Sequence, residues 1–246
     1  MREEAYHALH ALEEQHWWYV GARAIYRTLL EIGWGPPLGA RRMLEVGSGS
    51  GGNLALLSEY GPTVGLEPSP LALRLARQRP LGALVQGRAE ALPFARRAFD
   101  GVHLLGVIEH LDQDEAALRE AARVCRPEGA VTLLTSAVPL LWSHHDEANR
   151  HRRRYSRRQL QARLERAGLL PLRLSYQNFF TFLPTLLVRL WQRRRAQPPR
   201  YDMGRPPAPV NMLLIWLLRL EAWLIRFLPL PIGVDLVAVC RPASET

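Results

Sequence analysis

The sequence predicts an α/β fold built on a mostly parallel sheet, and two observations support this. From residue 42 onward, short apolar runs alternate with helical patterns, which is the rhythm of strand–helix–strand units. The chain has 246 residues, 48% of them hydrophobic and 22% charged, which suits one such domain with a sizeable insertion. Right-handed crossovers between successive strands are then expected.

The expected elements follow one another with short connections. Residues 3–32 show helical periodicity and end at the glycine- and proline-rich run 33–37. Next come alternating strands and helices, with strands expected at 43–46, 63–67, 83–86, 99–105 and 130–135, and helices at 53–60, 70–79 and 113–125. Ser156 can cap a helix over 157–167. The last two strands are expected at 169–176 and 234–241.

Charge and cysteine content indicate a cytoplasmic protein with an anionic neighbour. The formal net charge is +9, and every basic residue is an arginine. Such a charge suits a nucleic acid, an acidic membrane surface or a phosphorylated substrate. Cys125 and Cys240 lie outside any metal-type spacing, which favours a reducing compartment. Residues 1–11 resemble no signal peptide, and no 18-residue apolar run predicts a spanning helix.

The sharpest local signal is a glycine-rich turn after the first strand. Residues 47–53 read Gly-Ser-Gly-Ser-Gly-Gly-Asn, and such a turn lets a ligand lie against the backbone beside a helix N-terminus. Glu67 ends the next strand, where a carboxylate can accept hydrogen bonds from both hydroxyls of a ribose. Together these features predict a nucleoside-containing ligand.

The turn alone does not choose between ligands. Gly47, Gly49 and Gly52 also satisfy the GxGxxG pattern of dinucleotide binders, so an NAD-dependent oxidoreductase stays open as an alternative. A tight turn without a ligand is the plain structural alternative. Glu45 lies in an otherwise apolar strand, where a carboxylate needs a cation or hydrogen-bond donors. A positively charged ligand is therefore favoured over a pyrophosphate.

Several linked segments resemble the class I S-adenosylmethionine (SAM)-dependent methyltransferases, in the ubiquinone/menaquinone-biosynthesis-like (type 11) branch. The resemblance covers roughly residues 40–135 and rests on segments 44–53, 87–94, 99–102, 107–111 and 126–130. It implies a Rossmann-like, seven-stranded sheet whose last strand is antiparallel. It also implies SAM as the cofactor.

The resemblance implies a set of cofactor-binding residues. Glu45, Gly47 and Gly49 would hold the methionine end of SAM, with Gly51 and Asn53 in the same loop. The ribose and adenine would meet a second set, namely Glu67, Pro68, Ala89 and Glu90, and the floor near the sulfonium would be Gly106 and Val107. Arg88 departs from the pattern, because many relatives have an Asp there that reads the adenine amino group.

Two further segments resemble a narrower branch of methyltransferases, found among bacterial surface-glycan and lipid enzymes. They are residues 16–23 and 145–155, and they supply as acceptor-site candidates Trp17, Trp18, Arg23, Arg154 and Tyr155. A general base is expected at His145 or His151, with Asp146 orienting the ring and His110 in reserve. Core packing of the tryptophans and a solvated arginine run are the alternatives. The histidine spacing fits no firm metal pattern, so no metal is expected.

The chain is expected to divide into three parts. Residues 1–38 form a helical cap, residues 39–178 and 234–246 the SAM-binding domain, and residues 179–233 an apolar helical insertion. Within the insertion, apolar runs at 179–191 and 211–228 flank a basic, proline-rich link at 193–207. The apolar surface of the insertion could be buried in three ways: by capping the acceptor pocket, by forming a homodimer, or by lying on the inner membrane face through residues 179–228.

The sequence therefore predicts a methyl transfer from SAM to a small-molecule or lipid- or glycan-linked acceptor, with O-methylation preferred. An NAD-dependent oxidoreductase and a non-catalytic SAM-binding protein are the alternatives. A nucleic-acid partner is not expected, because the aromatic residues cluster with apolar ones and do not interleave with arginines.

Overall fold

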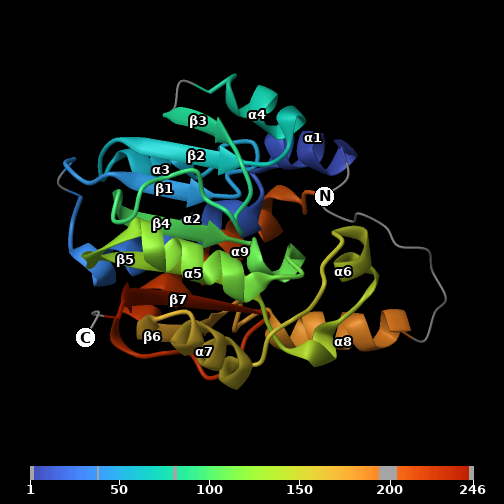
Figure 1. Cartoon of the computed structure of the whole chain (residues 1–246). Coiled ribbons are helices and arrows are strands. Elements are labelled where there is room, and N and C mark those ends of the chain that lie inside the picture. The colour runs from blue at the N-terminus through green and yellow to red at the C-terminus, as the bar shows by residue number, and fades with distance from the viewer. Residues whose placement is uncertain (1–2, 38, 80–81, 194–203, 244–246) are drawn as a thin grey trace.

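A seven-stranded sheet forms the centre of the computed structural model, which describes residues 3–37, 39–79, 82–193 and 204–243 (Figure 1). Its strand order is β3-β2-β1-β4-β5-β7-β6. The strands are β1 (Met43–Val46), β2 (Thr63–Glu67), β3 (Ala83–Gln86), β4 (Phe99–Leu105), β5 (Cys125–Ser136), β6 (Leu169–Gln177) and β7 (Asp235–Pro242). Strands β1 to β5 pair in parallel, while β7 is antiparallel to both β5 and β6. The predicted Rossmann-like sheet with an antiparallel last strand is confirmed.

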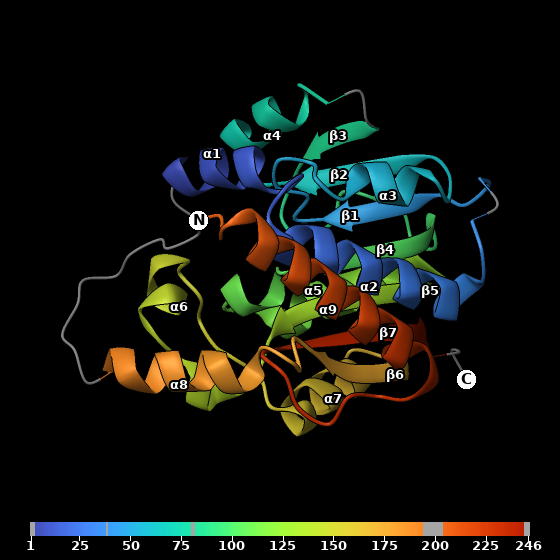
Figure 2. The same cartoon turned by 180° about the vertical axis from the view of Figure 1, so that it is seen from behind.

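Helices cover both faces of this sheet. Figures 1 and 2 show α5 and α7 over one face, and α2, α3 and α9 over the other. The helix bounds are α1 (Glu3–Leu12), α2 (Trp17–Trp34), α3 (Leu54–Ser58), α4 (Pro70–Ala76), α5 (Asp114–Val124), α6 (His144–Ala148), α7 (Arg157–Arg166), α8 (Phe182–Arg193) and α9 (Ala208–Phe227). Two 3-10 turns, η1 (Ile108–His110) and η2 (Pro139–Leu141), follow β4 and β5.

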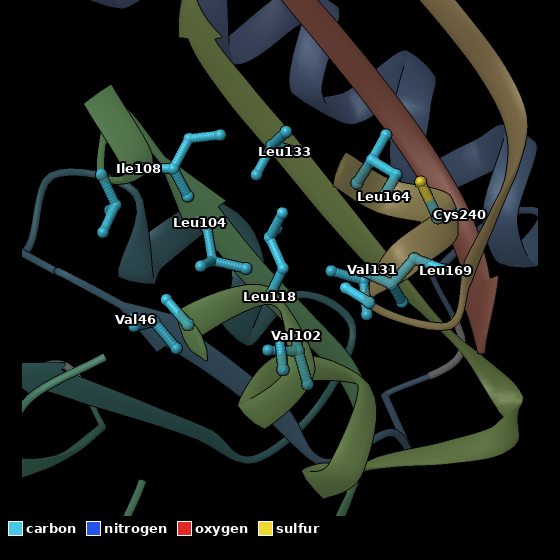
Figure 3. Close-up of a cluster of buried hydrophobic side chains, with 14 of the residues drawn as sticks. Val46, Val102, Leu104, Ile108, Leu118, Val131, Leu133, Leu164, Leu169 and Cys240 are labelled. Atoms are coloured by element: carbon cyan, nitrogen blue, oxygen red, sulfur yellow. The ribbon is translucent and has the colours of Figure 1, made fainter. Parts of the chain in front are cut away.

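The sheet buries a different apolar layer on each face, as strand alternation requires. Val131 and Leu133 of β5 belong to the layer under α5 and α7, with Leu118 and Leu164 from those helices (Figure 3). Alternate residues of β5 belong to the opposite layer, together with the inner sides of α2 and α9, and they include Ala130 and Leu134. The sheet is therefore held by apolar packing on both faces, and the loops at the ends of its strands can carry functional side chains.

The N-terminal helical region differs from the sequence prediction. It is two helices, because the chain breaks after Leu12 and restarts at Trp17, where His16 acts as the N-cap. Glu13 lies in the break and is buried against Ser50 and Arg79. Because the Glu13 side chain binds these distant partners, the first helix ends at Leu12, a position that the local periodicity of the sequence does not indicate.

Other element boundaries also differ from those that the sequence predicts. Residues 136–155, expected as an irregular connection, contain η2 and α6, and α6 begins with a capping box between Ser143 and Asp146. Strand β5 starts at Cys125, five residues early, because Phe99 pairs with Cys125 before a register shift in β4. Residues 194–203 of the expected basic link lie outside the described residues. The three-part division of the chain stays a prediction.

Helices α2 and α9 approach closely at Gly21. A Cβ atom at this position would lie 2.6 Å from Cβ of Leu218, a distance that normal packing does not allow. Cδ1 of the same leucine would lie closer still, and rotation about χ1 could move that atom but not Cβ. A glycine here permits α9 to pack against the outer face of α2.

We therefore expect Gly21→Ala to lower the free energy of unfolding by about 1–3 kcal/mol through overpacking. The sign of the change shows whether the site is crowded, because in an uncrowded helix Gly→Ala stabilises the protein by about 1 kcal/mol. Chemical denaturation of Gly21→Ala, Leu218→Ala and the double variant measures it. The double variant should lose less than the sum of the single losses, and a stabilised Gly21→Ala protein contradicts the close approach.

Candidate cofactor and acceptor site

A cavity of about 770 Å³ opens where the parallel strands end. Gly47, Pro68 and Gly106 line it, and they directly follow or lie just beyond β1, β2 and β4. This edge is where open α/β sheets bind their ligands. The cavity extends from Tyr6 on α1 to Arg189 on α8. Segments from both ends of the chain therefore contribute to one site.

The glycine loop has the geometry that its sequence predicts. Gly47, Gly49 and Gly51 have φ values of 73°, 54° and 84°, a region that disfavours side chains. A Cβ on Gly47 would also lie 2.6 Å from Cγ2 of Val107. Gly47, Gly49 and Val107 line the cavity. Gly51 does not line the cavity, in contrast to its predicted contact with the cofactor. Its positive φ instead lets the backbone make the turn.

Glu67 is held at the mouth of this loop by three donors. One carboxylate oxygen accepts the Gly49 N–H at 3.0 Å, and the other accepts the Ser69 N–H at 3.0 Å and the Tyr6 hydroxyl at 3.2 Å. Burial raises the pKa of Glu67, and the two backbone donors act against that rise. Burial, with the nearby Glu67, raises the pKa of Tyr6 to about 12, so this phenol keeps its proton at neutral pH.

Glu45 presents an unpartnered acceptor to the cavity. Its carboxylate is buried, and Oε1 accepts a hydrogen bond from Nδ2 of Asn53 at 2.9 Å. Its Oε2 atom is buried without a hydrogen-bond partner among the described residues. Burial raises the pKa of Glu45 to about 8, the Asn53 bond opposes this, and Glu13 and Glu67 add to it. An orphan acceptor beside two other carboxylates fits the ammonium group of a cationic ligand.

The predicted adenine-side residues also reach the cavity. Pro68, Ala89 and Glu90 line it, and so does Gly106, predicted to form the floor near the sulfonium. Arg88, the departure from the family pattern, is 76% exposed at its side chain and forms an ion pair with Glu90 at 3.3 Å. Arg88 therefore binds a neighbouring carboxylate at the rim.

Three histidines gather at the other end of the cavity. The His151 ring lies 4.6 Å from that of His110 and 6.5 Å from that of His145, centroid to centroid. Asp146 is fully buried and accepts from Nδ1 of His151 at 2.9 Å and from Nε of Arg154 at 2.7 Å. Burial opposes ionisation of Asp146, yet the bond to His151 and the charge of Arg154 outweigh it and lower its pKa to about 2.

This pairing distinguishes His151 from its neighbours. Because Asp146 is an ionised acceptor, Nδ1 of His151 must carry a hydrogen, which leaves Nε2 as the proton-accepting atom of the neutral ring. Burial lowers the pKa of His145 to about 3, helped by Arg189, and that of His110 to about 3, helped by His151. Buried rings that resist protonation are poor bases. His151 is the better-placed member of the predicted set.

The predicted acceptor residues divide into three groups. Trp17 and Trp18 line the cavity in part-buried positions. Arg23 lines it too, but its guanidinium donates to the Glu13 carbonyl at 2.7 Å and so secures the break between α1 and α2. The expectation for Tyr155 is wrong. It is 1% exposed, its hydroxyl donates to Asp114 at 2.6 Å, and it does not line the cavity.

Sequence reasoning missed several lining residues, among them Tyr6, Asn178, Thr181, Thr185, Arg189 and Asp235. One usable signal existed: Thr181, Thr185 and Arg189 recur at four-residue spacing in an otherwise apolar run, which puts them on one helix face. Asn178 has a φ of 61° immediately after β6, a tertiary feature with no local signature. Within the described ranges, no group of three His, Cys, Asp or Glu side chains is arranged to hold a metal.

Comparisons with known proteins bear on this geometry. A family model described as a methyltransferase domain matches residues 44–133. This segment belongs to the class I SAM-dependent methyltransferase family. SAM is accordingly the cofactor of the methyltransferase domain, and the acceptor groups described above fit it: an orphan carboxylate oxygen for the ammonium and Glu67 for the ribose hydroxyls.

Individual relatives match parts of the chain. An uncharacterised methyltransferase of Mycobacterium leprae is 38% identical over 102 residues, which is 40% of this chain and 38% of the relative. The malonyl-[acyl-carrier protein] O-methyltransferase of Methylococcus capsulatus is 26% identical over 185 residues, covering 70% of this chain and 66% of the relative. The chain thus matches about two fifths of the length of the first of these relatives.

A solved structure matches over nearly the whole chain. The Haloferax volcanii protein crystallised with the Trm112 methyltransferase activator superposes with a TM-score of 0.64 and 18% identity, covering 99% of this chain and 95% of the other. At this identity the likeness establishes the fold. The methyltransferase domain and its C-terminal additions therefore share one known architecture.

We expect SAM affinity to rise with pH between pH 6 and 8, by up to about tenfold per unit. The sign follows from Glu45, whose raised pKa of about 8 leaves it protonated below that pH, so cation binding must release its proton. Isothermal titration in buffers of different ionisation enthalpy measures both affinity and proton release. Glu45→Gln should bind more weakly with a flatter pH profile, and a wild-type affinity that is flat over this range argues against the ammonium contact.

Proposed function

We propose that the chain is a SAM-dependent methyltransferase that methylates an oxygen of a small-molecule or lipid- or glycan-linked acceptor. One observation carries the proposal: a single cavity is lined by the glycine loop with its carboxylates and also by His151, whose ring is hydrogen-bonded to the buried Asp146 behind it. The first is suited to a cationic nucleoside, and the second to removing a proton from a hydroxyl. Methyl transfer to oxygen needs both functions side by side.

At the cofactor end, the protein's task is orientation. When bound, SAM supplies an electrophilic methyl group. Glu45 and Asn53 would hold the amino-acid end, Glu67 would accept from the ribose hydroxyls, and the bare backbone at Gly47 and Gly49 would admit the ligand at close range. Tyr6 fixes the orientation of Glu67, since its hydroxyl stays protonated and donates to one carboxylate oxygen.

At the acceptor end, the protein's task is proton removal. Nε2 of His151 would take the hydroxyl proton as the acceptor oxygen bonds to the methyl carbon and the sulfur–methyl bond breaks, with S-adenosylhomocysteine as the leaving group. Nδ1 keeps its hydrogen and donates it in a hydrogen bond to Asp146. The Asp146 carboxylate stabilises the resulting imidazolium. Arg154 keeps that carboxylate in place, because it also donates to the carbonyl oxygen of Ala137 at 2.9 Å.

The oxidoreductase alternative fits the same cavity less well. Glu13, Glu45 and Glu67 are all buried around the glycine loop, and burial raises the pKa of each. A dinucleotide would bring a pyrophosphate beside these groups, at a cost in repulsion or protonation. A sulfonium and an ammonium instead relieve them. The methyltransferase family match points the same way.

We expect His151→Ala and Asp146→Asn to reduce methyl transfer at least about a hundredfold, the low end of general-base effects, while SAM affinity stays within about twofold. The assay follows labelled methyl from SAM into the lipid and polar fractions of an extract of the source organism. His144→Ala is the matched control and should retain turnover, because this neighbouring histidine does not line the cavity and lies 3.4 Å from Glu147 instead.

Two outcomes would contradict the proposal in different ways. Full turnover in both variants removes His151 as the base while leaving methyl transfer intact. A wild-type protein that binds SAM but labels no fraction supports the non-catalytic alternative. Thermal-shift titration with SAM and NAD distinguishes the cofactors independently of turnover.

A further inference from the structure

Helix α8 is polar on its inner side and apolar on its outer side. Thr185 and Arg189 line the cavity, as does Thr181 just before the helix. Leu183 and Leu187 are each 60% exposed, and they lie about 200° around the helix from the cavity-lining positions. Soluble helices bury the apolar side and expose the polar one. The reversal indicates that the outer side of α8 faces something other than water.

Helix α9 repeats the exposed apolar surface over a longer span. Its outer side carries large apolar residues that are 56–64% exposed, namely Met212, Leu213, Trp216, Trp223 and Phe227. Along the helix they recur at spacings of three, four and seven residues, with the exposed Arg219 between Trp216 and Trp223, and so lie on one stripe. Figure 2 shows α9 on the outside of the molecule, with α2 between it and the sheet. Contiguous exposed surfaces of this kind usually mark an interaction site.

The inner side of α9 is fixed to the body of the protein by buried polar groups. Asn211 accepts from the Trp17 N–H at 2.9 Å and donates to the Gln15 carbonyl at 3.0 Å. Glu221 is fully buried and accepts from the backbone N–H groups of Asn178 at 2.6 Å and Phe180 at 3.1 Å. These bonds hold α9 in register against α2 and the end of β6.

This anchoring decides between lying on a bilayer and crossing it. By length and composition α9 could span a membrane, and one third of its most apolar window is buried in the protein. Crossing would strip Glu221 of its donors and place its carboxyl group in lipid, where no water replaces them. Helix α9 therefore contacts lipid only with its outer side, parallel to the surface.

The charges favour a lipid partner over a second copy of the chain. Arg219 is exposed on the outer stripe of α9, Arg226 beside it forms an ion pair with Glu31 of α2, and the whole chain carries a net charge of +9. Two such faces would bring like charges together, whereas anionic headgroups attract them. Tryptophan is also enriched where protein meets the headgroup region, and Trp191, Trp216 and Trp223 are all exposed on these two helices.

We propose that the chain docks on the surface of an anionic lipid bilayer through the outer sides of α8 and α9. Because α8 is also a wall of the cavity, a single helix of about 10–12 Å diameter then separates the lipid from the acceptor end. Arg189, on the inner side, is the cationic group nearest that wall; its guanidinium donates to the Ser143 hydroxyl. Where the proposed function holds, this placement favours a lipid-linked acceptor taken from the membrane.

Vesicle co-sedimentation of the full chain tests the docking without measuring turnover. The probes are phosphatidylcholine vesicles with and without about 30% phosphatidylglycerol, at low and high salt. The variants are Leu183→Gln with Leu187→Gln on α8, and Leu213→Gln with Trp216→Gln on α9. The matched control is Leu170→Gln with Leu172→Gln on β6, two leucines of 54% and 47% exposure.

We expect binding to the anionic vesicles that falls with salt, and a loss of at least about tenfold in both helix variants but not in the control. SAM affinity measured on each variant confirms that it is folded, and it keeps a failure of docking separate from a failure of the proposed function. The proposal is overturned by absence of binding at low salt, by equal binding of all variants, or by a dimer that the helix substitutions dissociate.

Discussion

The site depends on a cluster of buried carboxylates, and one of them, Glu45, has an oxygen with no hydrogen-bond donor among the described residues. Glu67 joins three segments, because it accepts from the glycine loop, from the turn after β2 and from Tyr6 on α1. Burial raises the pKa of both Glu45 and Glu13, and the charges of Glu13 and Glu67 raise that of Glu45 further. Negative charge is thus concentrated at the one place in an arginine-rich chain where a cation must enter. The glycine loop and helix α1 each donate a hydrogen bond to this carboxylate cluster, and a cationic ligand would supply the remaining compensation for its charge.

The acceptor end of the cavity is positioned by the antiparallel strands of the sheet, and not by the glycine loop. The base is fixed because Asp146 is held by Arg154, and Arg154 also reaches the carbonyl oxygens of Ala137 and Val234, which flank β5 and β7. The orientation of His151 is therefore tied to the sheet through two steps of hydrogen bonding. This explains how a short helix on a long connection can position a proton acceptor as rigidly as a strand would.

The sequence predicted the fold and the cofactor end more fully than the acceptor end, for a physical reason. Strand alternation, glycine φ values and a carboxylate after β2 are local properties, so the positions of Gly47 and Glu67 follow from neighbours in the chain. The acceptor end is assembled from segments more than a hundred residues apart. Nothing local shows that Tyr155 is drawn into the core by Asp114, or that Tyr6 donates to Glu67. The break at Glu13 has the same origin, since its partners Ser50 and Arg79 lie far along the chain.

The insertion links the outer surface to the chemistry through one buried group. Glu221 of α9 holds the backbone at Asn178, and the Asn178 side chain donates to Asp235 at 2.7 Å, so two cavity-lining residues depend on the seating of α9. Burial raises the pKa of both Glu221 and Asp235, which shows how few solvent contacts remain to replace these bonds. Any contact that shifts α9 against α2 must therefore move the acceptor end of the cavity. Because the cofactor end rests on β1 and β2 instead, such a shift would act on the acceptor end and leave the glycine loop in place.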